Sequence, residues 1–280
     1  MSGPFTVAAD GTGDFLTIGA AIAVAQNGDT IRIKNGTYAP AWVSAGYFVI
    51  SKRLTLEAYP GHSPTLTYGT TPGGTINNPI LYLNGGAVTL RGLNIVGTYA
   101  LGMGSRFAEC NVYAETNLTM ENCTLTDFNH CGLKVVGGTS HTITNNVING
   151  GGYTSQDHCI YHATHSAGAY TYSNNELTGA AGWGLHLYNY EYDAAITSNN
   201  IHDNDNGGLL LTGENHTVTG NTITANGTGG GIRYYHSAVN LTVTGNTLSG
   251  NGTYDQLADF SAGEGFVNCT ISGNSGTKNF

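Results

Sequence analysis

The sequence predicts an all-β, single-stranded parallel β-helix, and three observations support this fold class. A Thr-rich strand followed by Asn and then Leu or Ile recurs six times between residues 143 and 274. In five copies the aligned Asn residues lie 29, 24, 22 and 25 positions apart, a period typical of a solenoid of stacked coils. The segments between them are short, β-rich and bounded by Gly and Asn, without a 3.6-residue periodicity.

The aligned Asn residues have a structural explanation. They are Asn146, Asn175, Asn199, Asn221 and Asn246. A coil must turn a corner between strands, and Asn tolerates left-handed backbone there. Stacked on the Asn of the next coil, a buried side-chain amide also satisfies its donors and its acceptor. We interpret further Asn-x-Thr/Ser sequences as part of this ladder pattern rather than as glycosylation acceptors, at Asn117, Asn215, Asn226, Asn240 and Asn251.

The first 38 residues are predicted to form an N-terminal cap and the first coil. Residues 17–26 are Ala-rich and favour a short helix that ends at Asn27-Gly28. The alternating segment that follows turns at Asn35-Gly36 and reads as a strand. A cap is needed because the end of a solenoid exposes apolar surface and unpaired strand edges.

Further coils follow in order, at residues 54–60, 79–97 and 117–128, and the regular body extends to about residue 251. Residues 252–280 hold one more coil and a polar tail. We expect one domain over residues 1–280, with roughly nine to eleven coils.

The segment VAADGTGDFLTIGAAIAVAQNGDTIRIKNGTY (7–38) resembles the N-terminal cap of the pectin-lyase-like, right-handed parallel β-helix superfamily. Its opening is most similar to that of pectin methylesterases. The chain has no counterpart of the catalytic segments of that family, so the resemblance implies a right-handed coil and not esterase activity.

Composition narrows the class of partner. The formal charge of −9 disfavours nucleic acid, because phosphate binding needs a basic face. No apolar run of 18 residues is present, so we expect no membrane span. Only 10% of residues are charged, while Gly, Asn, Thr and Tyr abound, as is common in extracellular, carbohydrate-associated β-proteins. We therefore expect a secreted or cell-surface protein, although no secretory signal is visible.

The cysteines do not form a zinc pattern. There are 5, and they lack the close pairing of metal sites. Cys131 and Cys159 fall near each other on successive coils, so a disulfide between them is one interpretation. The alternative, which we favour, is that the cysteines fill the stacked core as small apolar residues.

A second set of segments repeats opposite the Asn corners: CGLKVVG (131–137), CIYHAT (159–164), GLHLYN (184–189), GLLLTG (208–213) and GIRYYH (231–236). Strand side chains alternate between faces, so one column points inward: Leu133, Ile160, Leu185, Leu209 and Ile232. The next column points outward: Lys134, Tyr161, His186, Leu210 and Arg233. A neighbouring outward column holds Val136, Ala163, Tyr188, Thr212 and Tyr235.

The outward columns are the candidate functional site. The chain has only 9 Lys and Arg, and Lys134 and Arg233 fall in one column, roughly 19 Å apart at ~4.8 Å per coil. Aromatic rings beside polar donors suit the faces and hydroxyls of sugars, so we expect a polysaccharide partner. The alternative is a plain solvent-exposed face. His162 is two residues after the inward Ile160, so strand alternation places it on the same face and we expect it to pack inside.

The segment YTSQDHCIYH (153–162) resembles the Asp-His loops of β-helical alginate lyases and C5-epimerases, but lacks the Pro that epimerases carry between Asp and His. Both activities remove the proton α to a uronate carboxyl, which needs a base, an acid and a cation. We expect Tyr161, His186 and His158 as base or acid, and Arg233 or Lys134 as the cation. A Tyr base would require nearby cations to lower its pKa. The expected substrate-binding residues are Tyr188, Tyr235, Asp157, His236 and Asn189, with Asp157 and His158 at the rim.

Other interpretations stay open. Asp203 and Asp205 have a spacing that suits calcium, although a polar turn is the simpler explanation, and no other metal or cofactor is expected. Glu191, Asp193 and Asp157 could supply the paired carboxylates of a glycoside hydrolase. A non-catalytic β-helix, such as an adhesin or a phage or surface component, is the alternative from a different class.

Overall fold

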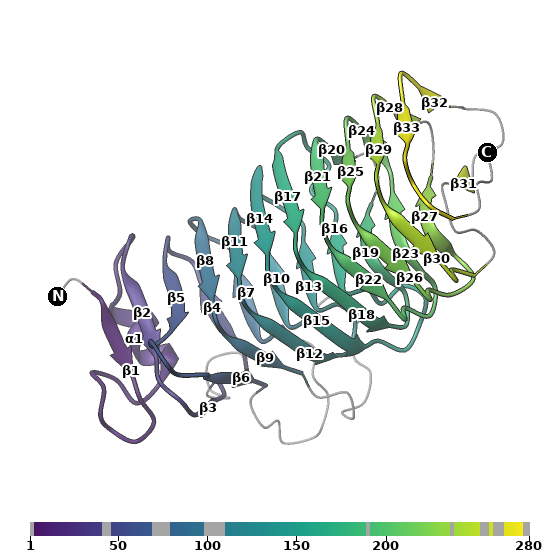
Figure 1. Ribbon diagram of the computed structural model, residues 1–280. Helices are drawn as coiled ribbons and strands as arrows, with labels where there is room; N and C mark the ends of the chain where they lie inside the picture. Colours follow the sequence, from purple (N-terminus) through teal and green to yellow (C-terminus); the bar gives the residue numbers. More distant parts are fainter. Residues whose placement is uncertain are drawn as a thin grey trace.

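The fold is a right-handed parallel β-helix, in which the chain winds through three long parallel sheets (Figure 1). The computed structural model describes residues 3–40, 46–68, 79–97, 110–188, 191–235, 238–252, 258–259 and 266–276. Every strand pairs in parallel with its counterpart on the neighbouring coil, as the repeat predicted. The described part makes about 9 turns, which confirms the expected all-β solenoid.

Sheet A has 11 strands in the described residues. They are β1 (Phe5–Val7), β2 (Thr30–Ile33), β5 (Thr55–Ala58), β8 (Val88–Arg91), β11 (Leu118–Glu121), β14 (Ser140–Thr144), β17 (Ala169–Ser173), β21 (Ala194–Thr197), β25 (Thr217–Thr219), β29 (Thr242–Thr244) and β33 (Thr270–Ser272). Their outward positions are rich in Thr, a residue whose branched side chain suits a half-buried pleated surface.

Sheet B follows sheet A on each coil and has 9 strands among the described residues. They are β3 (Thr37–Tyr38), β6 (Thr65–Thr67), β9 (Asn94–Val96), β12 (Thr124–Phe128), β15 (Val147–Gly151), β18 (Glu176–Ala180), β22 (Asn200–His202), β26 (Thr222–Thr224) and β30 (Thr247–Ser249).

Sheet C closes each coil and carries the candidate site. Its 9 described strands are β4 (Phe48–Ile50), β7 (Leu81–Leu83), β10 (Val112–Ala114), β13 (Leu133–Val135), β16 (Ile160–His162), β19 (Trp183–Leu187), β23 (Gly207–Leu211), β27 (Gly230–Tyr234) and β31 (Ala258–Asp259). A small fourth sheet lies between sheets C and A near the C-terminal end, with β20 (Glu191–Tyr192), β24 (Gly213–Glu214), β28 (Ala238–Val239) and β32 (Phe266–Val267).

The corner between sheets A and B is held by the predicted Asn ladder. From the second ladder Asn onward, each Oδ1 accepts from the backbone N–H and the Nδ2 of the ladder Asn one coil earlier, at 2.8–3.0 Å, and Asn274 continues the ladder beyond Asn246. The Oδ1 of the first, Asn146, accepts from the Cys123 N–H at 2.9 Å. The residue just before each ladder Asn has a positive φ, as in Asn145, Asn174 and Ser198. All donors and the acceptor of the buried amides are thereby used, which confirms the structural role of the ladder.

Two further ladders use the remaining corner asparagines. Asn204, Asn226 and Asn251 repeat the same buried pattern between sheets B and C. Asn240 donates to Asn215 at 2.9 Å on the exposed corner between sheets C and A. The interpretation of these Asn-x-Thr/Ser sequences as corner chemistry is therefore correct.

The cap is the expected short helix, α1 (Ile18–Val24). The side chain of Thr17 accepts from the Ala20 N–H at 3.2 Å and caps its N-terminus. The Nζ of Lys52 donates to the carbonyls of Ile22 and Ala25 at 2.9 and 2.7 Å, which satisfies the last turn. Ile18 and Ala21 are buried against the first coil.

The cysteines are all free thiols. Cys131 and Cys159 are buried and do not form the disulfide that their positions allowed, so packing inside the coil is their role. No described helix has the length and apolar character needed to cross a membrane.

Candidate functional site

The predicted outward column on sheet C is formed, in the expected register. Lys134 pairs with Tyr161, Tyr161 with His186, His186 with Leu210, and Leu210 with Arg233. The inward partners Leu133, Ile160, Leu185, Leu209 and Ile232 are all buried. The column also extends toward the N-terminus, because Lys134 pairs with Tyr113 and Tyr113 with Tyr82.

Lys134 lies between two aromatic rings. Its Nζ is 5.7 Å from the centre of the Tyr113 ring and 5.3 Å from that of Tyr161. Tyr113 in turn lies 5.7 Å from Tyr82, whose hydroxyl donates to Glu115 at 2.8 Å. The Lys134 side chain is 5% exposed, and its ammonium group lies near the faces of both rings, an arrangement that stabilises the positive charge.

His186 lies at the centre of an aromatic cluster. Its ring is 5.2 Å from Tyr161 and 5.5 Å from Tyr188, and both contacts are edge to face. The Tyr161 and Tyr188 rings are 5.6 Å apart. Tyr188 is 44% exposed, so this cluster presents an open aromatic surface at the middle of the column. The structure thus brings together the expected Lys134, Tyr161, His186 and Tyr188.

The neighbouring column is only partly outward. Tyr188 and Tyr235 are exposed, while Ala163 and Thr212 are buried. The backbone register is as predicted, since the Tyr188 N–H donates to the His162 carbonyl and the Tyr235 N–H to the Leu211 carbonyl. The Thr212 hydroxyl donates to the Leu187 carbonyl at 3.2 Å. Of the predicted second column, only Tyr188 and Tyr235 therefore present exposed side chains.

Asp157 does not lie at an exposed rim. It is 3% exposed, and its Oδ1 is 2.6 Å from Nδ1 of His130. Its Oδ2 accepts from the backbone N–H groups of Tyr153 and Thr154, both at 2.7 Å. Burial raises the pKa of Asp157, but the His130 hydrogen bond and these N–H groups outweigh burial and lower it. Both carboxylate oxygens therefore hold buried structure, Oδ1 with His130 and Oδ2 with the loop at Tyr153 and Thr154.

His158 also differs from the prediction, because it is fully buried beneath the column. Its ring stacks on Tyr161 at 5.6 Å and meets His186 edge to face at 4.8 Å. Burial and then the neighbouring His186 lower its pKa well below the usual value. Its place is therefore behind the site, in contact with two column residues.

The pKa of Tyr161 is raised, whereas a Tyr that acts as a base requires a lowered pKa. Burial, followed by the neighbouring Tyr188, raises the pKa of its phenol well above the usual value. The lowered pKa that a Tyr base requires is therefore not found at Tyr161, although the Nζ of Lys134 lies 5.3 Å from the centre of its ring. Tyr161 is therefore a neutral phenol that can donate a hydrogen bond.

A second polar cluster, which the sequence did not reveal, lies inside the coil. The Tyr172 hydroxyl is 2.7 Å from His162 Nδ1, and His162 Nε2 is 3.1 Å from the Thr164 hydroxyl. Thr164 donates to Glu191 at 2.8 Å, and Glu191 is fully buried. Burial raises the pKa of Glu191. His162 packs inside, as expected.

The positions of Asp157, Glu191 and Asp193 bear on the alternative that the protein is a glycoside hydrolase. Asp157 and Glu191 are both buried and already hydrogen-bonded, and only Asp193 is exposed. The three carboxylates named for hydrolysis therefore do not present a pair to solvent.

Arg233 occupies the column one rung beyond Leu210 and is half-buried. The remaining predicted site residues, Asn189 and His236, lie outside the described residues.

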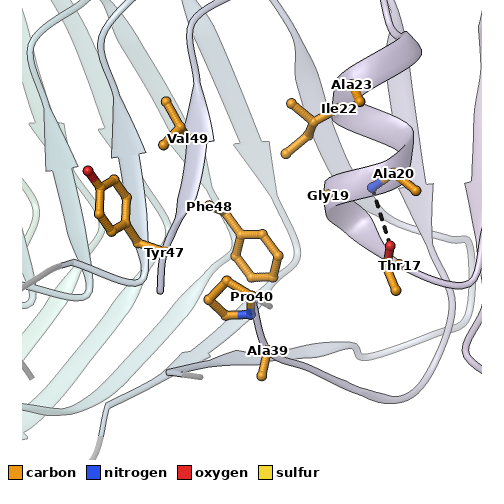
Figure 2. Close-up of a pocket in the computed structure, with 10 residues that line it drawn as sticks. All are labelled: Thr17, Gly19, Ala20, Ile22, Ala23, Ala39, Pro40, Tyr47, Phe48 and Val49. Atoms are coloured by element: carbon orange, nitrogen blue, oxygen red, sulfur yellow. Dashed lines mark hydrogen bonds between the residues drawn. The ribbon is translucent and has the colours of Figure 1, made fainter. Parts of the chain in front are cut away.

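Two hollows lie away from the column. An apolar one of about 480 Å³ separates α1 from β4, and Figure 2 shows Ile22, Phe48 and Pro40 on its walls. A polar one of about 320 Å³ is lined by Asp127, Asp205 and glycines at the corner of sheets B and C. Asp203 is paired with His202 at 2.7 Å. Among the described residues no group of three or more His, Cys, Asp or Glu side chains is placed to hold a metal ion.

Tyr82 and Tyr113 were missed in the sequence. Their strands, LYL (81–83) and VYA (112–114), alternate in the same way as LKV (133–135), so extending the register by two coils would have found them. The irregular spacing between these coils hid the match. With them, the column from Tyr82 to Arg233 spans roughly 29 Å at ~4.8 Å per coil.

Comparisons with known proteins agree with this architecture. A periplasmic alginate epimerase, AlgG, in a doubly substituted form, has a TM-score of 0.63 at 13% identity, covering 90% of this chain and 76% of its own. The complex of XylC with xylose has a TM-score of 0.60 at 11% identity, covering 91% and 69%. Pectate lyase Pel9A has a TM-score of 0.52 at 15% identity, covering 94% and 74%. Identities this low show a shared fold alone.

No curated protein matches the chain. A family profile described as a right handed beta helix region matches residues 110–275, which is more than half of the sequence. The chain therefore belongs to the right-handed β-helix family.

Proposed function

We propose that this protein is a polysaccharide-active enzyme that binds a uronic-acid polymer along the sheet C column and acts as a lyase or C5-epimerase. The observation that carries the proposal is the row of aromatic and cationic side chains on five successive coils from Tyr82 to His186, with Lys134 between Tyr113 and Tyr161. Arg233 continues the row beyond Leu210. Aromatic faces suit sugar rings, and two cations on an otherwise acidic protein suit carboxylates.

The dimensions support a polymer rather than a single sugar. The column of roughly 29 Å is several sugar units long at ~4.8 Å per coil. Exposed Tyr188 and Tyr235 flank it and widen the aromatic surface. Two of the compared structures, an alginate epimerase and a pectate lyase, are named for uronic-acid polymers.

In this proposal each column residue has a chemical role. Lys134 or Arg233 neutralises the uronate carboxyl, which makes the C5 proton more acidic. In elimination a base removes that proton, the C5 electrons form the C4–C5 double bond, and the bond from C4 to the glycosidic oxygen breaks. In this proposal Tyr161, whose phenol is neutral because burial raises its pKa, protonates the leaving oxygen. In epimerisation the proton returns to C5 from the opposite face and no bond to oxygen breaks.

A second candidate function is non-catalytic binding of the same polymer. One observation favours it: none of Tyr161, His186 and His158, the residues expected as base or acid, is free to act as a base. His158 is fully buried with both ring nitrogens hydrogen-bonded. Burial keeps Tyr161 protonated, and Nδ1 of His186 is occupied by a hydrogen bond to His158 at 3.0 Å. A binding module needs the aromatic and cationic column but no base.

Turnover on polymannuronate and polygalacturonate separates these functions. A lyase gives unsaturated chain ends, an epimerase gives inverted residues, and a hydrolase gives only new reducing ends. We expect Tyr161→Phe to reduce kcat by about 10²-fold or more, as is typical for loss of a general acid or base. Tyr113→Phe, two rungs away with the same ring, is the matched control and should keep kcat. If the wild-type protein binds these polymers but forms none of these products, the non-catalytic binding function is correct and the enzyme function is wrong.

A further inference from the structure

Beneath the column, a hydrogen bond from the backbone determines where the protons of two histidines lie. The N–H of Trp183 is 3.0 Å from Nδ1 of His158. A backbone N–H can only donate, so Nδ1 of His158 carries no proton. His158 is fully buried, and burial disfavours its charged form. The neutral ring must therefore carry its single proton on Nε2.

The second link passes this constraint to His186. Nε2 of His158 is 3.0 Å from Nδ1 of His186. Because Nε2 of His158 is the donor, Nδ1 of His186 accepts and carries no proton. Burial lowers the pKa of His186 to about 3, so its ring is also neutral at ordinary pH. The one proton of His186 is then on its own Nε2.

The Nε2–H of His186 is the group left for a ligand. Among the described residues no hydrogen bond uses this proton, and His186 is 7% exposed between Tyr161 and Tyr188. A neutral imidazole with a proton on Nε2 and an occupied Nδ1 can donate to an oxygen. It cannot accept a proton from a sugar carbon.

We propose that His158 is a positioning residue that holds His186 as the Nε2–H tautomer, so that His186 donates a hydrogen bond to a uronate carboxylate. The ligand in this inference rests on the proposed function, but the tautomer does not. The inference also assigns His186 as a donor, whereas the sequence left it open as base or acid.

The first test reads the tautomer directly, in the free wild-type protein. ¹⁵N NMR of histidine-labelled protein should show Nε2 of His186 protonated and Nδ1 bare, with His158 in the same state. A His186 protonated on Nδ1 would overturn the inference whatever the protein binds. This measurement needs no variant and no ligand.

Two isosteric variants then test the positioning role. In His158→Gln the side-chain amide can still donate to Nδ1 of His186, so we expect the Nε2–H tautomer and near wild-type affinity for an oligogalacturonate. In His158→Glu an acceptor replaces that donor, so we expect the opposite tautomer and at least tenfold weaker binding, as for loss of a hydrogen bond to a charged group. The Gln and Glu side chains have the same length and shape, so the comparison separates a donor from an acceptor at this position. Methyl-esterified oligogalacturonate controls for the carboxylate and should show a smaller difference between them.

The outcomes separate the two proposals. A reversed tautomer in His158→Glu with unchanged affinity would overturn the donor role of His186 and leave the proposed function standing. If the wild-type protein shows the expected tautomer but binds neither oligogalacturonate nor oligomannuronate, the uronate ligand and the proposed function are both wrong. The tautomer assignment would then hold as a fact about the free protein.

Discussion

Asn221→Ala tests whether the ladder between sheets A and B stabilises the coil. The Oδ1 of Asn221 accepts from the backbone N–H and the Nδ2 of Asn199, both at 2.9 Å. Its Nδ2 donates to the Ile196 carbonyl and to Asn246 Oδ1, also at 2.9 Å. The alanine variant loses all four bonds at a position that is 1% exposed, where water cannot replace them.

The expected cost follows from what each partner keeps. Asn199 Nδ2 still donates to the Tyr172 carbonyl, and Asn246 Oδ1 still accepts from the Asn221 N–H. The Asn199 N–H loses its acceptor, which costs about 1–3 kcal/mol for a buried group. With the weaker losses added, we expect Asn221→Ala to lower the free energy of unfolding by about 2–4 kcal/mol.

Asn200→Ala is the matched control, since Asn200 neighbours the ladder residue Asn199 but is exposed on β22. It should change stability by less than about 0.5 kcal/mol. Urea unfolding followed by circular dichroism measures both variants, and the folded Asn221→Ala protein should bind uronate oligosaccharides like the wild type. Equal, small effects in the two variants would refute the ladder as a source of stability.

The remaining predictions concern pH and charge. Burial lowers the pKa of His141 and His216 to about 4 from 6.5, so the unfolded chain binds protons in this window that the folded chain does not, and stability falls as pH falls through it. The variants His141→Asn and His216→Asn keep an acceptor for the N–H groups of Leu118 and Ala194. In urea titrations, each should reduce the loss of unfolding free energy between pH 7 and pH 5 by about 2 kcal/mol. An unchanged dependence of the unfolding free energy on pH would contradict this. In calorimetry, Arg233→Ala should weaken binding of an oligouronate about tenfold and leave binding of its methyl ester nearly unchanged, as expected for loss of a charged hydrogen bond. Equal losses of affinity for the two ligands would show that Arg233 does not contact the carboxylate. Lys134→Met keeps the packing between Tyr113 and Tyr161 but removes the charge, and it should reduce affinity more at low than at high salt; a salt-independent effect would assign Lys134 to packing alone.

The fold was predictable because its sequence signals are local and repeated. A Thr-rich strand, a left-handed corner and a buried Asn recur on each coil, so the register of Asn146 extends to Asn246 without knowledge of any long-range contact. The same repetition made Lys134, Tyr161 and His186 align correctly, since a one-residue slip would have placed them inside.

The parts of the site that were mispredicted depend on loops and corners, where strand alternation gives no information. Asp157 and His158 precede β16, and nothing in their sequence shows that His130 and the Trp183 N–H hold them inside. The pKa of Tyr161 could not be predicted from the sequence either, because burial by neighbouring coils and the neighbouring Tyr188 raise it. Burial of this kind is set by the stacking of several coils and not by any one segment.

The most direct test of the central claim is a crystal structure with a bound uronate oligosaccharide. We expect sugar rings along sheet C, against Tyr113, Tyr161 and Tyr188, with a carboxylate within hydrogen-bond distance of Lys134, His186 or Arg233. Sugar bound on sheet A or sheet B, or in the hollow beside α1, with sheet C empty, would contradict it.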